Sequence, residues 1–356
     1  SRNIHVDVPI VADALEAVTK MNEYVEHCET KKWRKQIAEW KEEHPLTMKN
    51  RVDMGPQDII EEINRLKKEK NAVILSHYYV DDDVKEVADY TGDSYYLSKV
   101  AKETDADIIV LSGVSFMGES AKLLNPEKTV LMPDSHADCP MAHMATVEYI
   151  EKVKEKYDDI AVVCYINSTA LLKSHSDVCV TSANAVKVVK ALPNKNILFI
   201  PDENLGRYVA SQIPEKNFIF NPGFCPIHKG ISAAELAECK KKYPDAEVLT
   251  HPECTQDVLA LSDFIGSTSG IIKYAGESKA ASFIICTECG VLYELRERYP
   301  DKTFYTVGLP TCVNMKKVTL EKILDVLKTG KNEIFLDNDL KDKALASLDK
   351  MLELAK

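Results

Sequence analysis

Three cysteines, Cys139, Cys225 and Cys312, recur along the chain at separations of 86 and 87 residues. Thiolates at three such positions are one fewer than the usual four cysteine ligands of a cubane iron–sulfur cluster. A cluster held in this way keeps one iron open, and an open metal position acts as a Lewis acid on a hydroxyl or carbonyl oxygen. A zinc ion with three protein ligands is the competing interpretation. The explanation without a metal is that the three thiols are simply buried. The shared spacing and the purely thiolate ligand set favour the cluster.

Acid–base side chains follow three apolar runs, AVILSHYY (72–79), IAVVCYIN (160–167) and AEVLTHPE (246–253). Each run is typical of a buried parallel strand. The polar residues at the ends of these strands are His77, Tyr79, Tyr165, Asn167, His251 and Glu253. Imidazole, phenol and carboxylate groups lying close together can transfer protons, because burial and neighbours move their pKa values. A single His or Tyr at a strand end is more often a packing residue, but recurrence in three runs favours a functional site.

A third set of residues carries hydroxyl groups. Asp89, Asp177 and Asp263 are each followed five residues later by a Ser or Thr that precedes a helix-like run. These hydroxyl residues are Ser94, Ser182 and Thr268, with Ser267 beside the last. Helix capping is the structural explanation, but the free N–H groups of a helix start also bind phosphate or carboxylate. Three converging helix starts would therefore collect small anions. The chain has no P-loop and no GxGxxG motif, so nucleotide binding by those routes is unsupported.

The elements that position these residues repeat with the same period. Each strand-like run is preceded by a helix-period segment, and the strand, the Asp, the hydroxyl and the cysteine all recur about every 87 residues. Self-similarity at a fixed period indicates repeated structural units. Helices alternating with strands form parallel sheets covered on both faces, and ligands bind beyond the carboxyl ends of such strands. The sequence thus predicts an α/β protein of three homologous three-layer α/β/α domains, related by pseudo-threefold symmetry, with a helical N-terminal extension.

The period also predicts the domain boundaries. We expect an N-terminal extension over 1–50, α/β repeats over 51–142, 143–230 and 231–318, and C-terminal helices over 319–356. The first of these helices, TLEKILDVLKT (319–329), begins where a fourth repeat would begin. We therefore expect the C-terminal helices to pack back on the first repeat.

Composition limits the class of protein. The chain has 356 residues, is 28% charged and 45% hydrophobic, and carries a formal net charge of -11. This charge opposes binding to nucleic acid, which depends on Lys and Arg. No apolar stretch is long enough to cross a bilayer, and the start lacks the features of a signal peptide, so we expect a cytoplasmic protein without a membrane partner. The ten cysteines are then expected to be free thiols or metal ligands rather than disulfides.

These segments together resemble the quinolinate synthase family over roughly residues 51–330. The matching stretches are EKNAVILSHYY, VADYTGDS, GVSFMGESAK, VLMPDSHADCPMA, YINSTA, VTSANAV, ILFIPDENLGRYVA, FCPIH, HPEC, DFIGSTSGII and GLPTCVNMKKVTLEKIL. The resemblance implies three α/β domains in one chain and a 4Fe-4S cluster on three cysteines. It also implies condensation of iminoaspartate with dihydroxyacetone phosphate to quinolinate, with loss of phosphate and water, in de novo NAD biosynthesis. A functional link to an enzyme that produces iminoaspartate follows from the same resemblance.

The resemblance assigns roles to the residues singled out above. It puts the cluster ligands at Cys139, Cys225 and Cys312. The substrate-binding residues that it implies are His77, Ser94, Tyr165, Asn167, Ser182, His251, Glu253, Ser267 and Thr268. The catalytic residues that it implies are Glu253, Tyr79, His77, His251 and Tyr165. Among these, Glu253 is the candidate general base and Tyr79 the candidate proton carrier.

Two features depart from the family pattern. HYYV has Val80 where the family more often has Gln, and Cys286 and Cys289 form an additional CxxC. Residues 1–46, with HVDVPIVADALEAV and KKWRKQIAEWKEEHPL, instead resemble a fragment of an acetolactate synthase-type thiamine diphosphate enzyme. A fragment of this size implies no thiamine chemistry.

Two alternative functions remain open from the residues alone. One is a non-catalytic iron–sulfur or zinc sensor that binds a small metabolite, which would not need an acid, a base and an open iron together. The other is a cluster-dependent hydro-lyase acting on a single hydroxy acid, which would not need a phosphate site.

Overall fold

The computed structural model describes residues 31–43 and 55–356. The chain divides into two compact units, one up to Gly55 and the other covering Pro56–Lys356. The described part of the first unit contains helix α2 (Lys31–Glu43), in agreement with a helical extension. Trp33 and Trp40 are exposed on this helix, and their rings meet edge to face with centroids 5.9 Å apart. The rest of the predicted extension lies outside the described residues.

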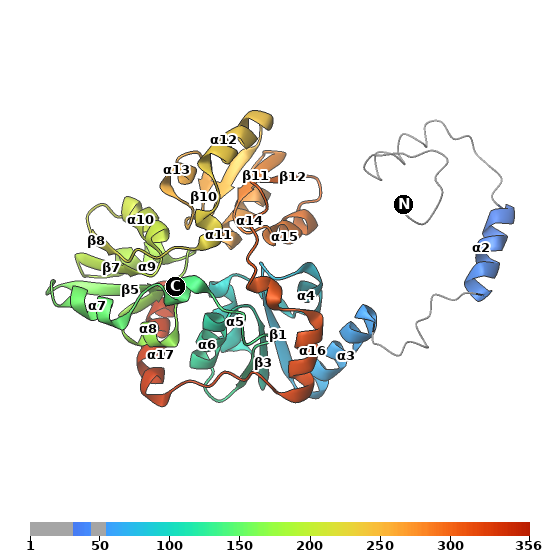
Figure 1. The fold of residues 1–356 in the computed structure, drawn as a ribbon, viewed down its shortest axis with the longest axis horizontal. Coiled ribbons are helices and arrows are strands. Elements are labelled where there is room, and N and C mark those ends of the chain that lie inside the picture. The colour runs from blue at the N-terminus through green and yellow to red at the C-terminus, as the bar shows by residue number, and fades with distance from the viewer. Residues whose placement is uncertain (1–30, 44–54) are drawn as a thin grey trace. The chain divides into compact units, whose positions relative to one another are not determined.

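The second unit contains three parallel four-stranded sheets, which Figure 1 shows as three lobes of the ribbon. The strands, in their order across each sheet, are β2 (Tyr90–Gly92), β1 (Ala72–His77), β3 (Ile108–Ser112) and β4 (Thr129–Leu131); β6 (Val178–Val180), β5 (Ile160–Tyr165), β7 (Asn196–Ile200) and β8 (Asn217–Phe220); and β10 (Phe264–Ile265), β9 (Glu247–Thr250), β11 (Ser282–Cys286) and β12 (Thr303–Thr306). All three sheets thus have the same strand order. This repetition confirms the predicted α/β fold class.

Helices connect and cover the strands. In chain order they are α3 (Pro56–Glu69), α4 (Asp82–Val87), α5 (Ser94–Glu103), α6 (Ser115–Leu124), η1 (Pro140–His143), α7 (Val147–Lys154), α8 (Ala170–Ser174), α9 (Ala185–Ala191), α10 (Glu203–Gln212), α11 (Pro226–Lys229), α12 (Ala233–Lys242), α13 (Gln256–Leu259), α14 (Thr268–Glu277), α15 (Val291–Arg298), η2 (Met315–Lys317), α16 (Leu320–Thr329) and α17 (Asn338–Leu354). Most of them are short, because each needs only to return the chain to the next strand of a small sheet.

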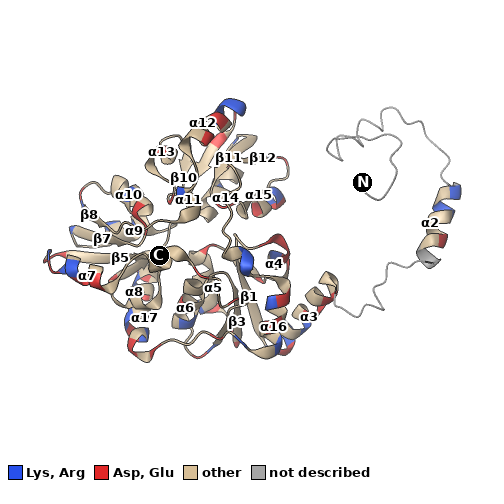
Figure 2. Ribbon diagram, in the orientation of Figure 1, with Lys and Arg blue, Asp and Glu red and all other residues tan. Residues whose placement is uncertain are grey.

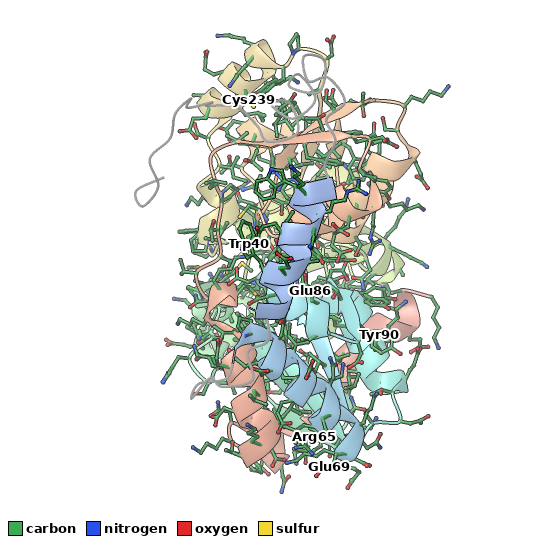
Figure 3. The ribbon with its side chains drawn as sticks, turned by 90° about the vertical axis from the view of Figure 1, so that its right-hand side faces the viewer. Trp40, Arg65, Glu69, Glu86, Tyr90 and Cys239 are labelled. Carbon is green, nitrogen blue, oxygen red and sulfur yellow. The ribbon has the colours of Figure 1, made fainter. Side chains whose placement is uncertain are left out.

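Helix α3 illustrates how the pattern of residues forms these elements. Ile59, Ile63 and Leu66 recur at helical spacing and are buried, so one face of α3 packs on the first repeat. On the outer face Arg65 pairs with Glu62 at 2.7 Å and with Glu69, and Figure 3 shows Arg65 and Glu69 on this exposed side. Such exposed pairs contribute little to stability, so the buried stripe holds the helix in place.

The recurring aspartates fix the central strand of each sheet. In each repeat the Asp carboxylate accepts the N–H of a residue in the middle of this strand, 15 positions earlier in the chain, and the Asp N–H donates to the carbonyl of the same residue. The pairs are Asp89 with Ile74 at 2.8 Å, Asp177 with Val162 at 2.7 Å and Asp263 with Val248 at 2.8 Å. This landmark of the repeat is therefore a structural clamp between the central strand and its neighbour.

Replacing Asp263 by Ala should lower the free energy of unfolding by about 1–3 kcal/mol, because a buried N–H of β9 loses a charged acceptor. Urea unfolding of the variant and of the parent protein, followed by circular dichroism, measures this difference. An unchanged unfolding midpoint would show that the bond contributes nothing to the fold.

The C-terminal helices pack on two different repeats. Helix α16 lies against α3 and β3 of the first repeat, whereas α17 lies mainly against α8 and β6 of the second. The Sγ of Cys179 in β6 is 3.2 Å from the Oγ of Ser347 in α17. Residues 56–356 form one continuous unit, so the division at residues 142, 230 and 318 stays a prediction.

The surface charge of the described residues is mixed. Figure 2 shows Lys and Arg interspersed with Asp and Glu along α7, α12 and α15. Among the helices of the described residues, none has the length and apolar character needed to span a membrane.

Candidate active site

A cavity of ≈ 180 Å³ lies where the three repeats meet. The predicted site residues that line it are His77, Tyr79, Ser94, Cys139, Tyr165, Asn167, Ser182, Cys225, His251, Glu253, Thr268 and Cys312. They follow the carboxyl ends of strands in all three sheets, as expected for parallel α/β sheets. Ser267 does not line the cavity; it caps α14, where its hydroxyl accepts the Gly270 N–H at 3.1 Å. The fold thus brings together all but one of the predicted residues.

The three recurring cysteines carry free thiols at this cavity. Burial raises the pKa of Cys139 to about 12 and also raises the pKa of Cys225 and Cys312. The Cys312 thiol contributes to the raised pKa of Cys139, and the Cys139 thiol to that of Cys225. Cys139 therefore interacts electrostatically with both of the other two thiols. Such thiols release their protons when a cation replaces them.

The two cysteines of the CxxC motif have different surroundings. Cys286 is fully buried at the end of β11, and Cys289 lies with its Sγ 3.4 Å from the Thr311 hydroxyl. Both are free thiols, and neither is among the residues that line the cavity. Val80, the other departure from the family pattern, is also fully buried and away from the cavity lining.

Glu253 is a buried, ionised carboxylate at the centre of this site. Its Oε1 accepts a hydrogen bond from the Tyr165 hydroxyl at 2.5 Å, and its Oε2 lies 2.7 Å from Nδ1 of His228. Burial favours the neutral acid, but the neighbouring His228 and His251 and the two hydrogen bonds outweigh it and lower the pKa of Glu253 to about 2. Burial and the Glu253 charge raise the pKa of Tyr165 well above its usual value. Tyr165 therefore remains a hydrogen-bond donor to Glu253.

His77 and His251 are held in the same way in two different repeats. The Tyr79 N–H donates to Nδ1 of His77 at 3.2 Å, and the Glu253 N–H donates to Nδ1 of His251 at 3.3 Å. Nδ1 is thus an acceptor in both rings, which puts the proton on Nε2. Burial lowers the pKa of each histidine to about 3, assisted by Lys85 for His77 and by His228 for His251. At neutral pH both rings are neutral and donate through Nε2.

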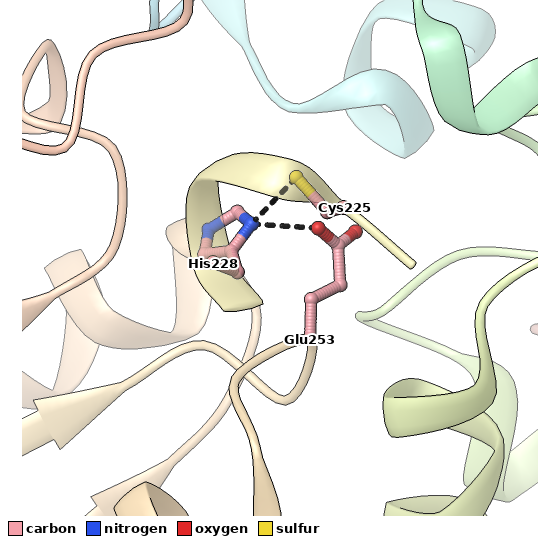
Figure 4. Close-up of side chains that lie close together, drawn as sticks. All are labelled: Cys225, His228 and Glu253. Carbon is pink, nitrogen blue, oxygen red and sulfur yellow. Dashed lines mark hydrogen bonds and ion pairs between the residues drawn. The ribbon is translucent and has the colours of Figure 1, made fainter. Parts of the chain in front are cut away.

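His228 was not among the residues predicted from the sequence. Its Nδ1 lies 2.7 Å from Glu253 Oε2 and 3.2 Å from Cys225 Sγ, as Figure 4 shows. The CPIH segment could have indicated it, since the short helix α11 turns residues 225 and 228 toward the same side. The ligand-type atoms of Cys225, His228 and Glu253 all lie within 4.8 Å of one another. This mixed group is the alternative metal-binding set of the site.

A continuous chain of hydrogen bonds connects Tyr79 to Glu253. The Tyr79 hydroxyl lies 2.6 Å from the Thr268 hydroxyl and 2.9 Å from that of Thr287. Thr287 Oγ1 in turn lies 2.8 Å from Nε2 of His228, whose other ring nitrogen contacts Glu253. Thr287, like His228, was not predicted. The two candidate proton-transfer groups are thereby linked through side chains of the second and third repeats.

The hydroxyl residues differ in their relation to the helix starts. Asp93, not Ser94, caps α5, accepting the Tyr96 N–H at 2.9 Å. Ser182 precedes α9 by several residues, and its hydroxyl lies 3.2 Å from Nε2 of His251. Capping therefore explains Ser267 but does not explain Ser94 or Ser182. These two, with Thr268, line the cavity.

Two buried polar atoms in the wall of the cavity have no hydrogen-bond partner within the protein. They are Oδ1 of Asn167 and Oγ1 of Thr181. Buried polar atoms are nearly always paired, so an unpaired atom in a residue that lines the cavity makes Asn167 and Thr181 candidate ligand-binding residues. Asn167 was predicted to bind substrate, whereas Thr181 was not predicted.

Comparison with known proteins assigns the chain to a family. The family model described as quinolinate synthetase A protein matches residues 61–353. A quinolinate synthase of Clostridioides difficile is 51% identical over 300 residues, which cover 84% of this chain and 99% of the relative. A quinolinate synthase of Fusobacterium nucleatum is 50% identical over 293 residues, covering 82% and 98%. Quinolinate synthase 2 of Methanosarcina acetivorans is 47% identical over 309 residues, covering 86% and 99%. This chain therefore belongs to the quinolinate synthetase A protein family.

Proposed function

We propose that this protein catalyses the condensation of iminoaspartate with dihydroxyacetone phosphate to quinolinate, with loss of phosphate and water. The observation that carries the proposal is the convergence of three thiols and of Glu253, Tyr79, His77 and His251 on one cavity. Family membership and the names of the relatives support the same reaction. The reaction belongs to de novo NAD biosynthesis and is expected in the cytoplasm.

The thiols of Cys139, Cys225 and Cys312 fit a 4Fe-4S cluster. All three line one cavity, and hydrogen bonds from backbone N–H groups oppose the effect of burial on the pKa of each thiol, from Met141 for Cys139, His228 for Cys225, and Met315 and Asn314 for Cys312. Hydrogen bonds to sulfur are typical of cluster ligands. The mixed set of Cys225, His228 and Glu253 uses one recurring cysteine only, and its His and Glu already pair with each other. When bound, the cluster supplies a Lewis-acidic iron that polarises a substrate oxygen.

The remaining polar groups are suited to two anionic substrates. Ser94 and Thr268 are the first residues of α5 and α14, where N–H groups and the helix dipole favour phosphate and carboxylate, and Ser182 lines the same cavity. The neutral rings of His77 and His251 carry their proton on Nε2, so His77 can donate to a substrate oxygen, while His251 lies 3.2 Å from the Ser182 hydroxyl and orients it. Asn167 and Thr181 supply the two unpaired atoms that a substrate would complete.

Glu253 is the proposed general base. Ring formation requires removal of protons from carbon, and a carboxylate in the cavity can accept them. The pKa of Glu253 is low chiefly because His228 lies beside it and donates to it, and an anionic substrate in the cavity opposes this effect and raises the pKa toward the range of an effective base. The chain through His228 and Thr287 to Tyr79 then provides a path along which the accepted proton can leave.

The proposal also implies how the substrates reach the enzyme. Iminoaspartate is an imine and hydrolyses in water, so an enzyme that oxidises aspartate must supply it continuously. We expect a functional link between the two enzymes. Neither nucleic acid nor a membrane is expected as a partner.

The proposed reaction is tested by anaerobic turnover. Reconstituted protein given dihydroxyacetone phosphate and iminoaspartate generated in the same vessel should release quinolinate and phosphate in equal amounts, measured by chromatography and a phosphate assay. Cluster-loaded protein that forms no quinolinate from these substrates contradicts the proposal.

Deleting residues 1–46 should leave this turnover within about threefold of the parent chain. The reason is that the predicted site residues begin at His77 and the family match begins at residue 61. The comparison uses both chains reconstituted in parallel, with the iron content as the control for loading. A large loss of activity at full iron content would show that the extension shapes the active site.

A further inference from the structure

The backbone N–H of each recurring cysteine donates to a carboxylate. Cys139 donates to Asp138 Oδ1 at 2.8 Å, Cys225 to Asp202 Oδ2 at 3.0 Å, and Cys312 to Glu288 Oε1 at 3.0 Å. None of these acids has a role in the chemistry described above. The same bond at all three cysteines calls for a common explanation.

In the second and third repeats the acid occupies one equivalent position. Asp202 lies two residues after the end of β7, and Glu288 lies two residues after the end of β11. Both are fully buried. Each uses its second oxygen to accept an N–H of its own turn, from Leu205 at 2.7 Å for Asp202 and from Gly290 at 2.6 Å for Glu288. Each carboxylate therefore ties a cysteine loop to the end of a sheet strand.

The first repeat makes the same bond with a different residue. Its position two residues after the end of β3 is Val114, which has no acceptor side chain. The acid is instead Asp138, directly before Cys139, and it is fixed by the Ser115 hydroxyl and by Nε2 of His143 at 2.7 Å. The bond to the cysteine N–H is thus kept although the residue that makes it has changed. The three loops therefore share the hydrogen bond to the cysteine N–H, but not the position of the acid that accepts it.

Such a bond limits the directions that the thiol can take. Fixing the N–H fixes the peptide plane before the cysteine and with it the N–Cα bond, so that only rotation about this bond changes the direction of Cα–Cβ. Residues behind the ligands of a metal centre commonly hold those ligands in position in this way.

We propose that Asp138, Asp202 and Glu288 are positioning residues that direct the three thiols toward one point, so that the ligand set is formed before a cluster binds. This inference rests on the proposed cluster at Cys139, Cys225 and Cys312. The acids act through the cysteine backbone, and of the three only Glu288 is also among the residues that line the cavity.

The test measures retention of the cluster rather than activity. Asp138→Ala, Asp202→Ala and Glu288→Ala are reconstituted anaerobically, iron and sulfide per chain are determined, and the loss of cluster absorption is timed after addition of a chelator. Loss should be about 10- to 100-fold faster than in the parent, the range typical of removing such a supporting partner. Asp138→Asn should restore retention to within about threefold of the parent, because its amide oxygen can still accept the Cys139 N–H.

Matched controls separate positioning from general stability. Asp177→Ala and Asp263→Ala also remove a carboxylate that accepts a backbone N–H, in the second and third repeats but away from the cavity. They should lose cluster at the parent rate even where urea unfolding shows a less stable apoprotein. Asp202→Ala or Glu288→Ala could fail to fold because both side chains are buried. In that case Asp138→Ala and Asp138→Asn still test the inference, because the Asp138 side chain is 44% exposed and its replacement leaves the core intact.

Any one of three results overturns the inference. The three Ala variants could lose the cluster at the parent rate, or the Asp177→Ala and Asp263→Ala controls could lose it as fast as the three Ala variants. The third is that Asp138→Asn loses the cluster as fast as Asp138→Ala. A parent protein that assembles no cluster instead overturns the proposed function. The two failures are therefore distinguishable in one experiment.

Discussion

Glu253→Gln should slow quinolinate formation by about 10²- to 10⁴-fold, the usual effect of losing one general base, while the cluster and substrate binding remain. The amide keeps the shape of the side chain and can still accept a hydrogen bond from Tyr165. It cannot take a proton from carbon. Substrate binding should survive because the anionic groups are held by Ser94, Ser182 and Thr268 at the wall of the cavity.

The measurement is single-turnover formation of quinolinate by anaerobic enzyme, together with the change that substrate causes in the EPR signal of the cluster. Glu294→Gln is the matched control, since it removes a carboxylate that pairs with Arg298 at 2.8 Å outside the cavity lining. Turnover of Glu253→Gln within threefold of the parent would transfer the role of base to another group, with Tyr79 the first candidate because it is linked to His228 through Thr287.

Changing any one of Cys139, Cys225 or Cys312 to Ala or Ser should abolish both the cluster and the activity. A cubane with three protein ligands has no spare ligand, and a cluster held by only two thiolates is readily lost. Cys286→Ala and Cys289→Ala should leave both properties intact, because neither side chain lines the cavity. Iron and sulfide assays after identical anaerobic reconstitution compare the five variants. Full cluster content in Cys225→Ala would refute the ligand assignment.

The fold and most of the site follow from the sequence for a simple geometric reason. Parallel strands end at one edge of a sheet, so polar residues that recur at strand ends must face the same side of each domain. The period then relates the domains to one another, which is how His77, Tyr165 and Glu253 could be predicted to converge. The convergence of Cys139, Cys225 and Cys312 follows from the same period.

The partners of these residues could not be predicted in the same way. His228 reaches Glu253 from a different loop, and Thr287 joins His228 to Tyr79 across two repeats. These contacts depend on how the repeats meet, which periodicity does not specify. The sequence also did not show which of two adjacent residues caps a helix: Asp93, and not Ser94, caps α5. The role of the aspartates five positions before the hydroxyl residues was not predicted either: Asp89, Asp177 and Asp263 each bind the backbone of a central strand.

The central claim is that three thiolates leave one iron open to substrate in the cavity that contains Glu253. Its most direct test is the Mössbauer spectrum of the anaerobically reconstituted parent protein, with iron and sulfide assays, before and after addition of dihydroxyacetone phosphate and iminoaspartate. The account predicts about four iron and four sulfide per chain, with one iron site of the cluster changing when substrate binds. Bound zinc without sulfide, or a cluster whose four iron sites are all unaffected by substrate, would contradict it.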